Sequence, residues 1–358
     1  MKIAFVTSCL EPGCDGVGDY TALLTEECER QGHTVTRIAL NDPFIQQATS
    51  VEGLLRLSSR EDWSLRAAKA HECLREFQPD FVSLQFVCYG FHPRGLVGQV
   101  ASQLRASLAG RPLQVMFHEL WIGEESGATW KSRAVGWLQQ HGVLRLMRSL
   151  AVRVIHTSNA AYVFRLGKCG LKARQLPLFG SLPKPLNVNT DTVEWTAVLF
   201  GTLHPIWPPE PLLAQLRKLD GAGTIIHAGR IGAGLGLWQQ MERDYAGDFT
   251  FRRLGELPPA EIAELFASAS FGVATTPWAI IGKSASVAAM LDCGLPVVVN
   301  RDDVQYAGYT ARDDEHPLLV KMSRNLPTQL RAVKRMPPRL RLPEVAAQFL
   351  SDCAEVLR

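Results

Sequence analysis

The sequence predicts an α/β protein with two doubly wound domains, in each of which helices cover both faces of a parallel sheet. A chain of 358 residues is too long for one ordinary hydrophobic core, so two domains are expected. Short apolar runs alternate with helical segments in two series, and a proline-rich stretch at residues 177–195 separates them. With 46% apolar and 20% charged residues, the composition excludes a disordered protein.

The first series predicts an N-terminal domain over residues 1–180. Its apolar runs have the length and the β-branched content of buried parallel strands. The expected strands are residues 2–8, 34–40, 80–86, 113–119 and 152–158. Ligands of such sheets bind beyond the carboxyl ends of the strands, so polar residues near those ends are the candidates for a site.

Residues 181–195 are the expected linker, because prolines and turn-forming residues replace the apolar pattern there. A second Rossmann-like domain is predicted over residues 196–335. Its expected strands are residues 196–202, 223–229, 248–255, 271–277 and 295–300. Residues 336–358 end in an amphipathic helix, which could pack back on the N-terminal domain.

The stretch at residues 271–300 is predicted to form strand, loop, helix and strand. Ser284 is a suitable N-cap for the helix, and Gly294 is a suitable left-handed C-cap. The loop would bring Gly282, Lys283 and Ser284 to the helix N-terminus, where free N–H groups and a lysine favour an anion such as phosphate. A plain crossover with a solvated lysine is the alternative. A Walker A loop is excluded, because a proline occupies the position of its first glycine.

A second candidate for anion binding is the turn GVGDYT, which follows the first strand. Gly16 and Gly18 would let a phosphate or a sugar approach the backbone beside another helix N-terminus. The dinucleotide-binding pattern is incomplete, because Thr21 replaces its third glycine and Asp42 is only the nearest acidic residue to the end of the second strand. A tight turn without a ligand is the alternative.

Charge, cysteines and hydropathy define the expected compartment. The net charge of +3 is too small to indicate nucleic acid. Eight cysteines form no CxxC pair, and the apolar start is too brief for a signal peptide, which favours a reducing cytoplasm. No run is long enough to cross a membrane. No metal is expected, because no His/Cys cluster has the spacing of ligands and no DxD motif occurs.

Six segments occur along the chain in the order GVGDYT, LQFVCYGF, VMFHELW, LPLFGSLP, LGELPPAEIAELFASASFGVATTP and MLDCGLPVVV. These segments and their order resemble those of family 4 glycosyltransferases, and the resemblance spans most of the chain. The resemblance implies the GT-B fold, in which two Rossmann-like domains face each other across a cleft. It also implies a hexosyltransferase-like enzyme that moves a sugar from a UDP- or GDP-sugar to a hydroxyl of a glycan, a lipid-linked sugar or a protein. Transfer would be retaining and metal-independent, with no cofactor besides the nucleotide sugar.

Within the resemblance, His118 is the candidate catalytic residue. It follows a buried strand and matches the family's active-site histidine, and an imidazole can donate to a sugar hydroxyl or move a proton near neutral pH. A structural histidine is the alternative. Glu119 is a candidate base, or else a helix-cap carboxylate. The acceptor is expected near polar residues around the ends of the first and third strands, namely Asp19, Tyr20, Gln85 and Tyr89.

The donor site departs from the family pattern. Ile281 and Ala289 occupy the positions of two glutamates that grip the donor, and Thr202 occupies that of an arginine. A buried diphosphate needs compensating charge, because an isolated buried ion is strongly unfavourable. Arg230 and the turn at residues 282–284, together with the glycine turn, are the expected replacements.

Two other functions stay open at this point. A non-catalytic GT-B protein that supports an active transferase is the main alternative, because both glutamates are absent, and a nucleotide-sugar epimerase is another. Residues 130–153 carry basic side chains among tryptophans and leucines. This pattern predicts either peripheral contact with the inner face of the membrane or a core-packed helix with a solvated basic face.

Overall fold

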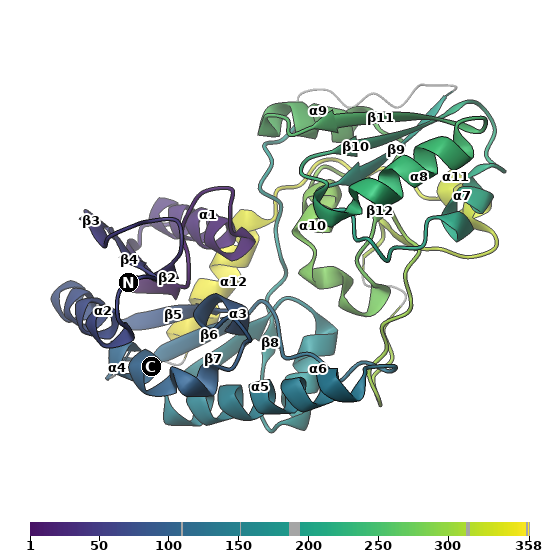
Figure 1. Cartoon of the computed structure of the whole chain (residues 1–358). Helices are drawn as coiled ribbons and strands as arrows, with labels where there is room; N and C mark the ends of the chain where they lie inside the picture. The colour runs from purple at the N-terminus through teal and green to yellow at the C-terminus, as the bar shows by residue number, and fades with distance from the viewer. Residues whose placement is uncertain (109, 151, 186–193, 313–315, 356, 358) are drawn as a thin grey trace. The chain divides into compact units, whose positions relative to one another are not determined.

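The computed structural model describes residues 1–108, 110–150, 152–185, 194–312, 316–355 and 357. It divides the chain into two compact units, each built around its own sheet (Figure 1). The first unit comprises Met1–Pro177, Tyr306–Tyr309 and Leu342–Arg358, and the second comprises Leu178–Gln305 and Thr310–Arg341. Most of the expected linker, residues 186–193, lies outside the described residues.

The sheet of the first unit has the strand order β3-β4-β2-β1-β5-β6-β7-β8. Its central strands pair in parallel and are those that the sequence predicts, although several are shorter. They are β1 (Lys2–Thr7), β2 (Thr34–Asp42), β5 (Phe81–Phe86), β6 (Leu113–Phe117) and β7 (Val152–Thr157). The outer strands β3 (Thr49–Val51), β4 (Leu54–Ser58) and β8 (Arg174–Gln175) are not predicted, because they are short and β3 and β8 are exposed throughout, without an apolar pattern.

The first unit also contains a helix from the far end of the sequence, α12 (Leu342–Glu355), which Figure 1 shows in yellow among the purple and blue elements. Its Phe349 is buried, with its ring centroid 5.5 Å from that of Phe5 and 5.9 Å from that of Phe81. The other helices of this unit are α1 (Gly16–Arg30), α2 (Trp63–Phe77), α3 (Cys88–Phe91), η1 (Val97–Gln99), α4 (Ala101–Leu108), α5 (Trp130–Ser149) and α6 (Ala160–Lys168).

The second unit has a parallel sheet with the strand order β11-β10-β9-β12-β13-β14. Two clusters of buried apolar side chains form its core. The strands are β9 (Trp195–Phe200), β10 (Gly223–Ala228), β11 (Phe249–Gly255), β12 (Phe271–Ala274), β13 (Val297–Val299) and the unpredicted β14 (Leu319–Lys321). The helices are α7 (Glu210–Leu216), η2 (Gly232–Gly234), α8 (Leu235–Tyr245), α9 (Pro259–Ser268), η3 (Trp278–Lys283), α10 (Ala285–Asp292) and α11 (Leu326–Ala332).

The connection from β12 to β13 has both caps that the sequence predicts. The Ser284 Oγ accepts a hydrogen bond from the Val287 N–H at the start of α10. At the other end, Gly294 adopts a φ of +71°, and the next N–H, of Leu295, donates to the carbonyl of Met290 in a Schellman arrangement. The segment before α10 is not a simple loop: η3 consists of two 3₁₀ turns joined by a kink at Ile280, and its apolar residues are buried.

Candidate functional site

His118 lies directly after β6, at the carboxyl end of the first sheet. Its Nε2 is 2.8 Å from the Oε1 of Gln85 on β5, and the ring of Tyr20 packs edge-on against it, with the centroids 4.8 Å apart. Burial lowers the pKa of His118 to about 3, so its imidazole is neutral at physiological pH. An amide oxygen can only accept, so Nε2 carries the proton and Nδ1 carries a lone pair.

Two of the residues expected to contact an acceptor instead support His118. Tyr20 is buried against the imidazole, and burial raises its pKa. Gln85 is also buried, and its amide nitrogen donates to Ser83 while its oxygen accepts from His118. Both side chains are too deeply buried to contact an acceptor, so their predicted role as acceptor-binding residues is corrected. Tyr20 lies on α1 and Gln85 near the end of β5, and the sequence could not show which way either side chain points.

The other predicted residues near this edge have separate positions. Asp19 accepts a hydrogen bond from the N–H of Gly13 and so shapes the turn before α1. Glu119 is half-buried beside His118 and is not the N-cap of the next helix along the chain, α5, which is Thr129. Its two alternative roles, as a base or as a helix-cap carboxylate, both stay predictions.

Tyr89 is exposed and lines a pocket of about 740 Å³ in the first unit, which we call the first-unit pocket. The aromatic residues Phe44, Trp63 and Phe91 also line it, together with the side chain of Arg66. The Arg66 guanidinium lies 3.9 Å from the centroid of the Trp63 ring and donates to the carbonyl of Leu40. The pocket therefore combines aromatic faces with fixed polar groups.

The glycine turn is built for packing and not for an anion. A Cβ on Gly18 would stand 2.8 Å from the carbonyl oxygen of Cys9, so this glycine lets α1 approach the loop after β1. Gly16 begins α1, and its N-cap is Asp15, whose carboxylate accepts from the N–H of Val17. A carboxylate at the helix N-terminus occupies the place that a phosphate would take. The predicted diphosphate contact of Gly16 and Gly18 is therefore not supported.

A second pocket of about 210 Å³ lies in the second unit, at the carboxyl ends of β9, β10 and β12, and we call it the second-unit pocket. It includes the predicted residues Thr202 and Ser284. Sequence reasoning missed the rest of its polar lining, which is formed by Gly201, Thr275, Thr276, Ser286 and His227. Most of these follow a strand or begin α10, so the rule that selected candidates after strand ends could have found them.

His227 is the unusual member of the second-unit pocket, because its side chain is 0% exposed. Its Nε2 is 2.8 Å from the carbonyl oxygen of Gly201, which can only accept, so Nε2 carries the proton. Burial lowers the pKa of His227 and keeps the ring neutral. The Nδ1 lone pair has no hydrogen-bond partner among the described residues.

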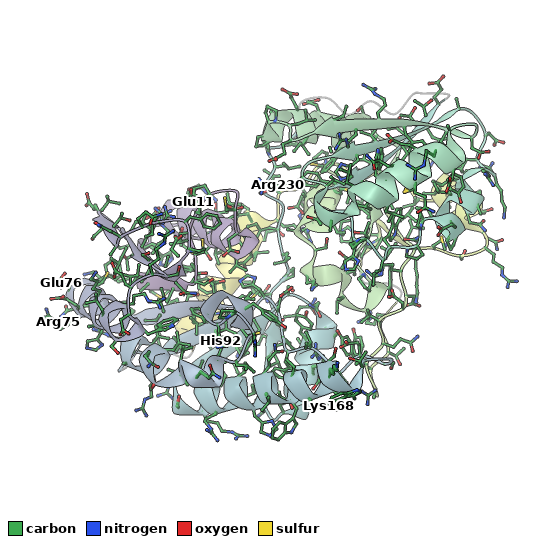
Figure 2. All side chains as sticks on the ribbon, in the orientation of Figure 1. Glu11, Arg75, Glu76, His92, Lys168 and Arg230 are labelled. Carbon is green, nitrogen blue, oxygen red and sulfur yellow. The ribbon has the colours of Figure 1, made fainter. Side chains whose placement is uncertain are left out.

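The charges expected at the donor site do not line the second-unit pocket. Arg230, which is labelled in Figure 2, is 64% exposed and does not line the pocket. It pairs with Glu256, with an Nη2 to Oε2 distance of 3.0 Å. Gly282 and Lys283 end η3, directly before the N-cap of α10, and are not among the described lining residues either. A missed cation lies closer: the buried Arg301 donates to the carbonyl of Thr275, which does line the pocket, and pairs with Asp303.

The positions of the two family glutamates belong to the apolar core. Ile281 and Ala289 are both buried in the same core cluster. A Cβ on Gly180 would stand 2.8 Å from the Cα of Ala289, so α10 packs closely against the chain at this point. A larger, charged side chain at residue 289 would disturb that contact, which gives the alanine a structural reason.

The exposed face of α5 combines apolar and basic residues. Trp130 is 74% exposed, Trp137 57% and Leu138 50%, and these three residues lie on one side of the helix. The basic residues Lys131, Arg133, Arg145 and Arg148 are exposed along the same helix, which contains no acidic residue. Among the described residues, no helix has the length and hydropathy to span a membrane, and no group of side chains is arranged to hold a metal.

The sequence matches no protein-family model, and a search of curated proteins found no significant match. Solved structures are similar in fold. The catalytic domain of starch synthase IV from Arabidopsis thaliana, bound to ADP and acarbose, has a TM-score of 0.60 at 11% identity, over 99% of each chain. Alr3699/HepE of Anabaena, in complex with UDP and glucose, has a TM-score of 0.57 at 14% identity, over 100% of this chain and 95% of the other.

A third similar structure is AviGT4, a glycosyltransferase involved in avilamycin A biosynthesis, with a TM-score of 0.54 at 16% identity over 99% of this chain and 98% of the other. These similarities extend over both units. The predicted fold class is therefore confirmed: the protein has the α/β fold of GT-B glycosyltransferases.

Proposed function

We propose that the protein is a glycosyltransferase that uses a nucleotide-sugar donor and a hydroxyl acceptor. The observation that carries the proposal is the second-unit pocket, which combines hydroxyl side chains, the start of α10 and the buried His227 at the carboxyl end of a Rossmann-like sheet. Proteins of the same fold are described with ADP or UDP bound, which supports a nucleotide as the ligand.

In this proposal the second-unit pocket binds part of the nucleotide diphosphate. The hydroxyls of Thr202, Thr275 and Ser286 would hydrogen-bond the ligand, and the dipole of α10 would favour its negative charge. Arg301 and Lys283 would add positive charge from beside the pocket, as electrostatic preorganisation without a metal requires. A retaining mechanism is part of the same proposal and rests on the family resemblance alone.

The first unit would supply His118 and the acceptor pocket. Because His118 is neutral with its proton on Nε2, it would accept a hydrogen bond from a sugar hydroxyl through Nδ1, instead of donating one. The aromatic faces around Tyr89 in the first-unit pocket suit the apolar face of a sugar ring, and Arg66 and Asn41 add polar groups to its lining.

Calorimetric titration with UDP, GDP, ADP and dTDP tests the donor site. We expect one nucleotide to bind the wild type, and Thr202→Trp, which fills the mouth of the second-unit pocket from an exposed position, to weaken that binding by at least about tenfold. Thr250→Trp, at an exposed position of β11 outside the pocket, is the matched control and should bind normally. Equal affinity in both variants would refute the assigned pocket.

A non-catalytic GT-B protein is the second candidate, and one observation favours it: the described lining of the second-unit pocket contains no lysine, arginine, aspartate or glutamate. If none of the nucleotides binds, this candidate is preferred. If a nucleotide binds, incubation with the matching nucleotide sugar separates the enzymes. Transfer or hydrolysis releases free nucleotide diphosphate, whereas an epimerase forms a new sugar without releasing it.

We also propose that the exposed face of α5 contacts an anionic membrane surface. Tryptophan is favoured at the membrane interface, and exposed lysine and arginine attract anionic lipids. Sedimentation with phosphatidylglycerol vesicles should recover the wild type, while Trp130→Ser/Trp137→Ser should reduce binding by about tenfold. Ile206→Ser, at an equally exposed apolar residue of the second unit, is the control. Equal binding to phosphatidylcholine vesicles, or no loss in the double variant, would refute the contact.

A further inference from the structure

A continuous line of side-chain hydrogen bonds crosses the interior of the first unit, from His118 to the C-terminal helix. Its successive distances are 2.8 Å from His118 Nε2 to Gln85 Oε1, 2.7 Å from Gln85 Nε2 to Ser83 Oγ, and 2.6 Å from Ser83 Oγ to Gln114 Oε1. It continues over 3.1 Å from Gln114 Nε2 to His156 Nδ1 and 2.8 Å from His156 Nε2 to Asp352 Oδ2.

The line runs across neighbouring strands and ends on α12. Ser83 and Gln85 lie on β5, Gln114 on β6 and His156 on β7, and all four side chains are buried. A buried polar group that loses its partner destabilises the fold, so each member holds the next in one orientation.

The carboxylate at the far end sets the direction of every bond. The other oxygen of Asp352, Oδ1, accepts from Arg174 on β8 at 2.7 Å, and Arg174 also pairs with Glu355. A carboxylate can only accept, so the proton of His156 is on Nε2. Burial lowers the pKa of His156, and the neutral ring must therefore accept at Nδ1 from the amide nitrogen of Gln114.

The donor of each remaining hydrogen bond, from Gln114 to His118, is fixed in the same way. Since the Gln114 nitrogen donates to His156, its oxygen accepts from the hydroxyl of Ser83, whose own lone pair accepts from the nitrogen of Gln85. The oxygen of Gln85 is then the group that faces His118, and it accepts from Nε2. Each donor points from His118 toward Asp352.

We propose that Asp352 is a positioning residue for His118: through this line it fixes the Nε2-protonated tautomer and leaves the Nδ1 lone pair for a substrate hydroxyl. Its importance for catalysis rests on the proposed function, whereas the fixed tautomer does not. Asp352 touches no candidate substrate-binding residue, so it acts only through its neighbours. The proposal gives α12 a chemical role besides packing.

The variant Asp352→Asn tests the proposal because it reverses the line. Arg174 can only donate, so it takes the single amide oxygen at residue 352 and turns the amide N–H toward His156 Nε2. His156 must then be protonated at Nδ1, both glutamines turn over, and His118 becomes the acceptor at Nε2 with its proton on Nδ1. Asp352→Glu keeps the carboxylate, and Glu355→Gln alters the other partner of Arg174 without touching the line.

Nitrogen-15 NMR of histidine-labelled full-length protein reads the tautomer directly, with His118→Gln to assign the signal. We expect Nε2-protonated His118 in the wild type, Asp352→Glu and Glu355→Gln, and predominantly Nδ1-protonated His118 in Asp352→Asn. An Nδ1-protonated ring in the wild type would overturn the proposal whether or not the variants fold. An unchanged tautomer in folded Asp352→Asn would overturn it as well.

Kinetics then connects the tautomer to activity. If the protein transfers sugar, Asp352→Asn should lower kcat by about tenfold, as loss of an outer-shell partner does elsewhere, while Asp352→Glu restores most of it. Wild-type kcat in a folded Asp352→Asn variant whose tautomer has changed would show that the lone pair of His118 is not used. A protein without transferase activity would refute the proposed function and leave the NMR result intact.

Discussion

His118 in the first unit and His227 in the second have the same chemical state but different supports. In each, Nε2 lies 2.8 Å from a carbonyl-type oxygen, and burial lowers the pKa of the ring. Both are therefore neutral, with a lone pair on Nδ1. The oxygen that holds His227 belongs to the backbone of Gly201, whereas the oxygen that holds His118 belongs to a side chain that depends on others.

This difference predicts how each site responds to substitution. Any residue at position 201 has a carbonyl, so the tautomer of His227 withstands changes in neighbouring side chains. The tautomer of His118 depends on partners on three strands and a helix, so single substitutions remote from it can change it. Substitutions can therefore change the tautomer of His118 more easily than that of His227.

The largest expected effect comes from removing the core contact that holds α12. Phe349→Ala should destabilise the protein by about 3–5 kcal/mol, because a fully buried phenylalanine is replaced by a cavity. Trp238→Ala removes a buried aromatic side chain beside His227 and is the corresponding variant of the second unit. Urea unfolding gives the size, and hydrogen exchange locates it. We expect reduced protection in β1 and β5 for the first variant and in β10 for the second, and the reverse pattern would contradict the separate cores.

Removing His118 should lower sugar transfer by about 10²-fold in kcat, the lower end of the range for a group that acts on a substrate proton. His118→Ala is compared with His141→Ala, an exposed histidine of α5 that contacts Trp137 and not the site. Steady-state kinetics with saturating donor measures the effect. Equal rates in the two variants would make His118 a structural residue.

His227→Phe should weaken nucleotide binding by about tenfold, the loss expected when one hydrogen bond to a charged ligand is removed. The ring volume stays similar, although the carbonyl of Gly201 loses its donor, so stability should fall by about 1–3 kcal/mol. Calorimetric titration measures the affinity. If affinity is unchanged while stability falls, the ring belongs to the core and its Nδ1 does not face the ligand.

Acidification should destabilise the wild type more than a His118→Gln variant. The folded pKa of His118, about 3, lies below the unfolded value of about 6.5, so the unfolded chain binds more protons between these values. Its contribution is fully present above pH 6.5 and is lost as the pH falls toward 3. Urea midpoints at pH 7 and pH 5 measure this dependence, and an equal shift in both proteins would contradict the burial of the ring.

The smallest effect is expected for Arg230→Ala. The Arg230–Glu256 pair is exposed, and such pairs contribute less than about 1 kcal/mol. Stability should change by no more than about 0.5 kcal/mol, and nucleotide affinity should stay within about threefold of wild type. A tenfold loss of affinity would show that Arg230 leaves Glu256 and binds the diphosphate, as the sequence alone suggested.

Sequence reasoning predicted the fold well because local signals were strong. The central strands are continuous apolar runs, and Ser284 and Gly294 cap the two ends of α10 as predicted. It failed for β3 and β8, which are short and exposed, so neither hydrophobic period nor length marks them. The apolar loop WAIIGK proved to be a buried 3₁₀-helix for a related reason: burial there depends on distant packing partners.

The candidate sites were predicted less completely, because a strand end shows where a residue lies and not which way it points. Thr202, Ser284 and Tyr89 line pockets, whereas Tyr20 and Gln85 support His118 from within the core. Gly18 was assigned to a ligand but contacts the backbone at Cys9. The partnership of His156 with Asp352 joins residues 196 positions apart, and no spacing rule connects them.

The place of α12 has a consequence for biosynthesis. β1 leaves the ribosome before α12 does, yet Phe349 covers Phe5 only after residues 342–355 have been made. Domains usually fold in the order of their synthesis. Here the first unit needs α12 to complete its core, and α12 follows Arg341, the last residue of the second unit. The second unit is therefore synthesised in full before the first, and a nascent chain stalled before α12 would expose the apolar surface of β1 and β5.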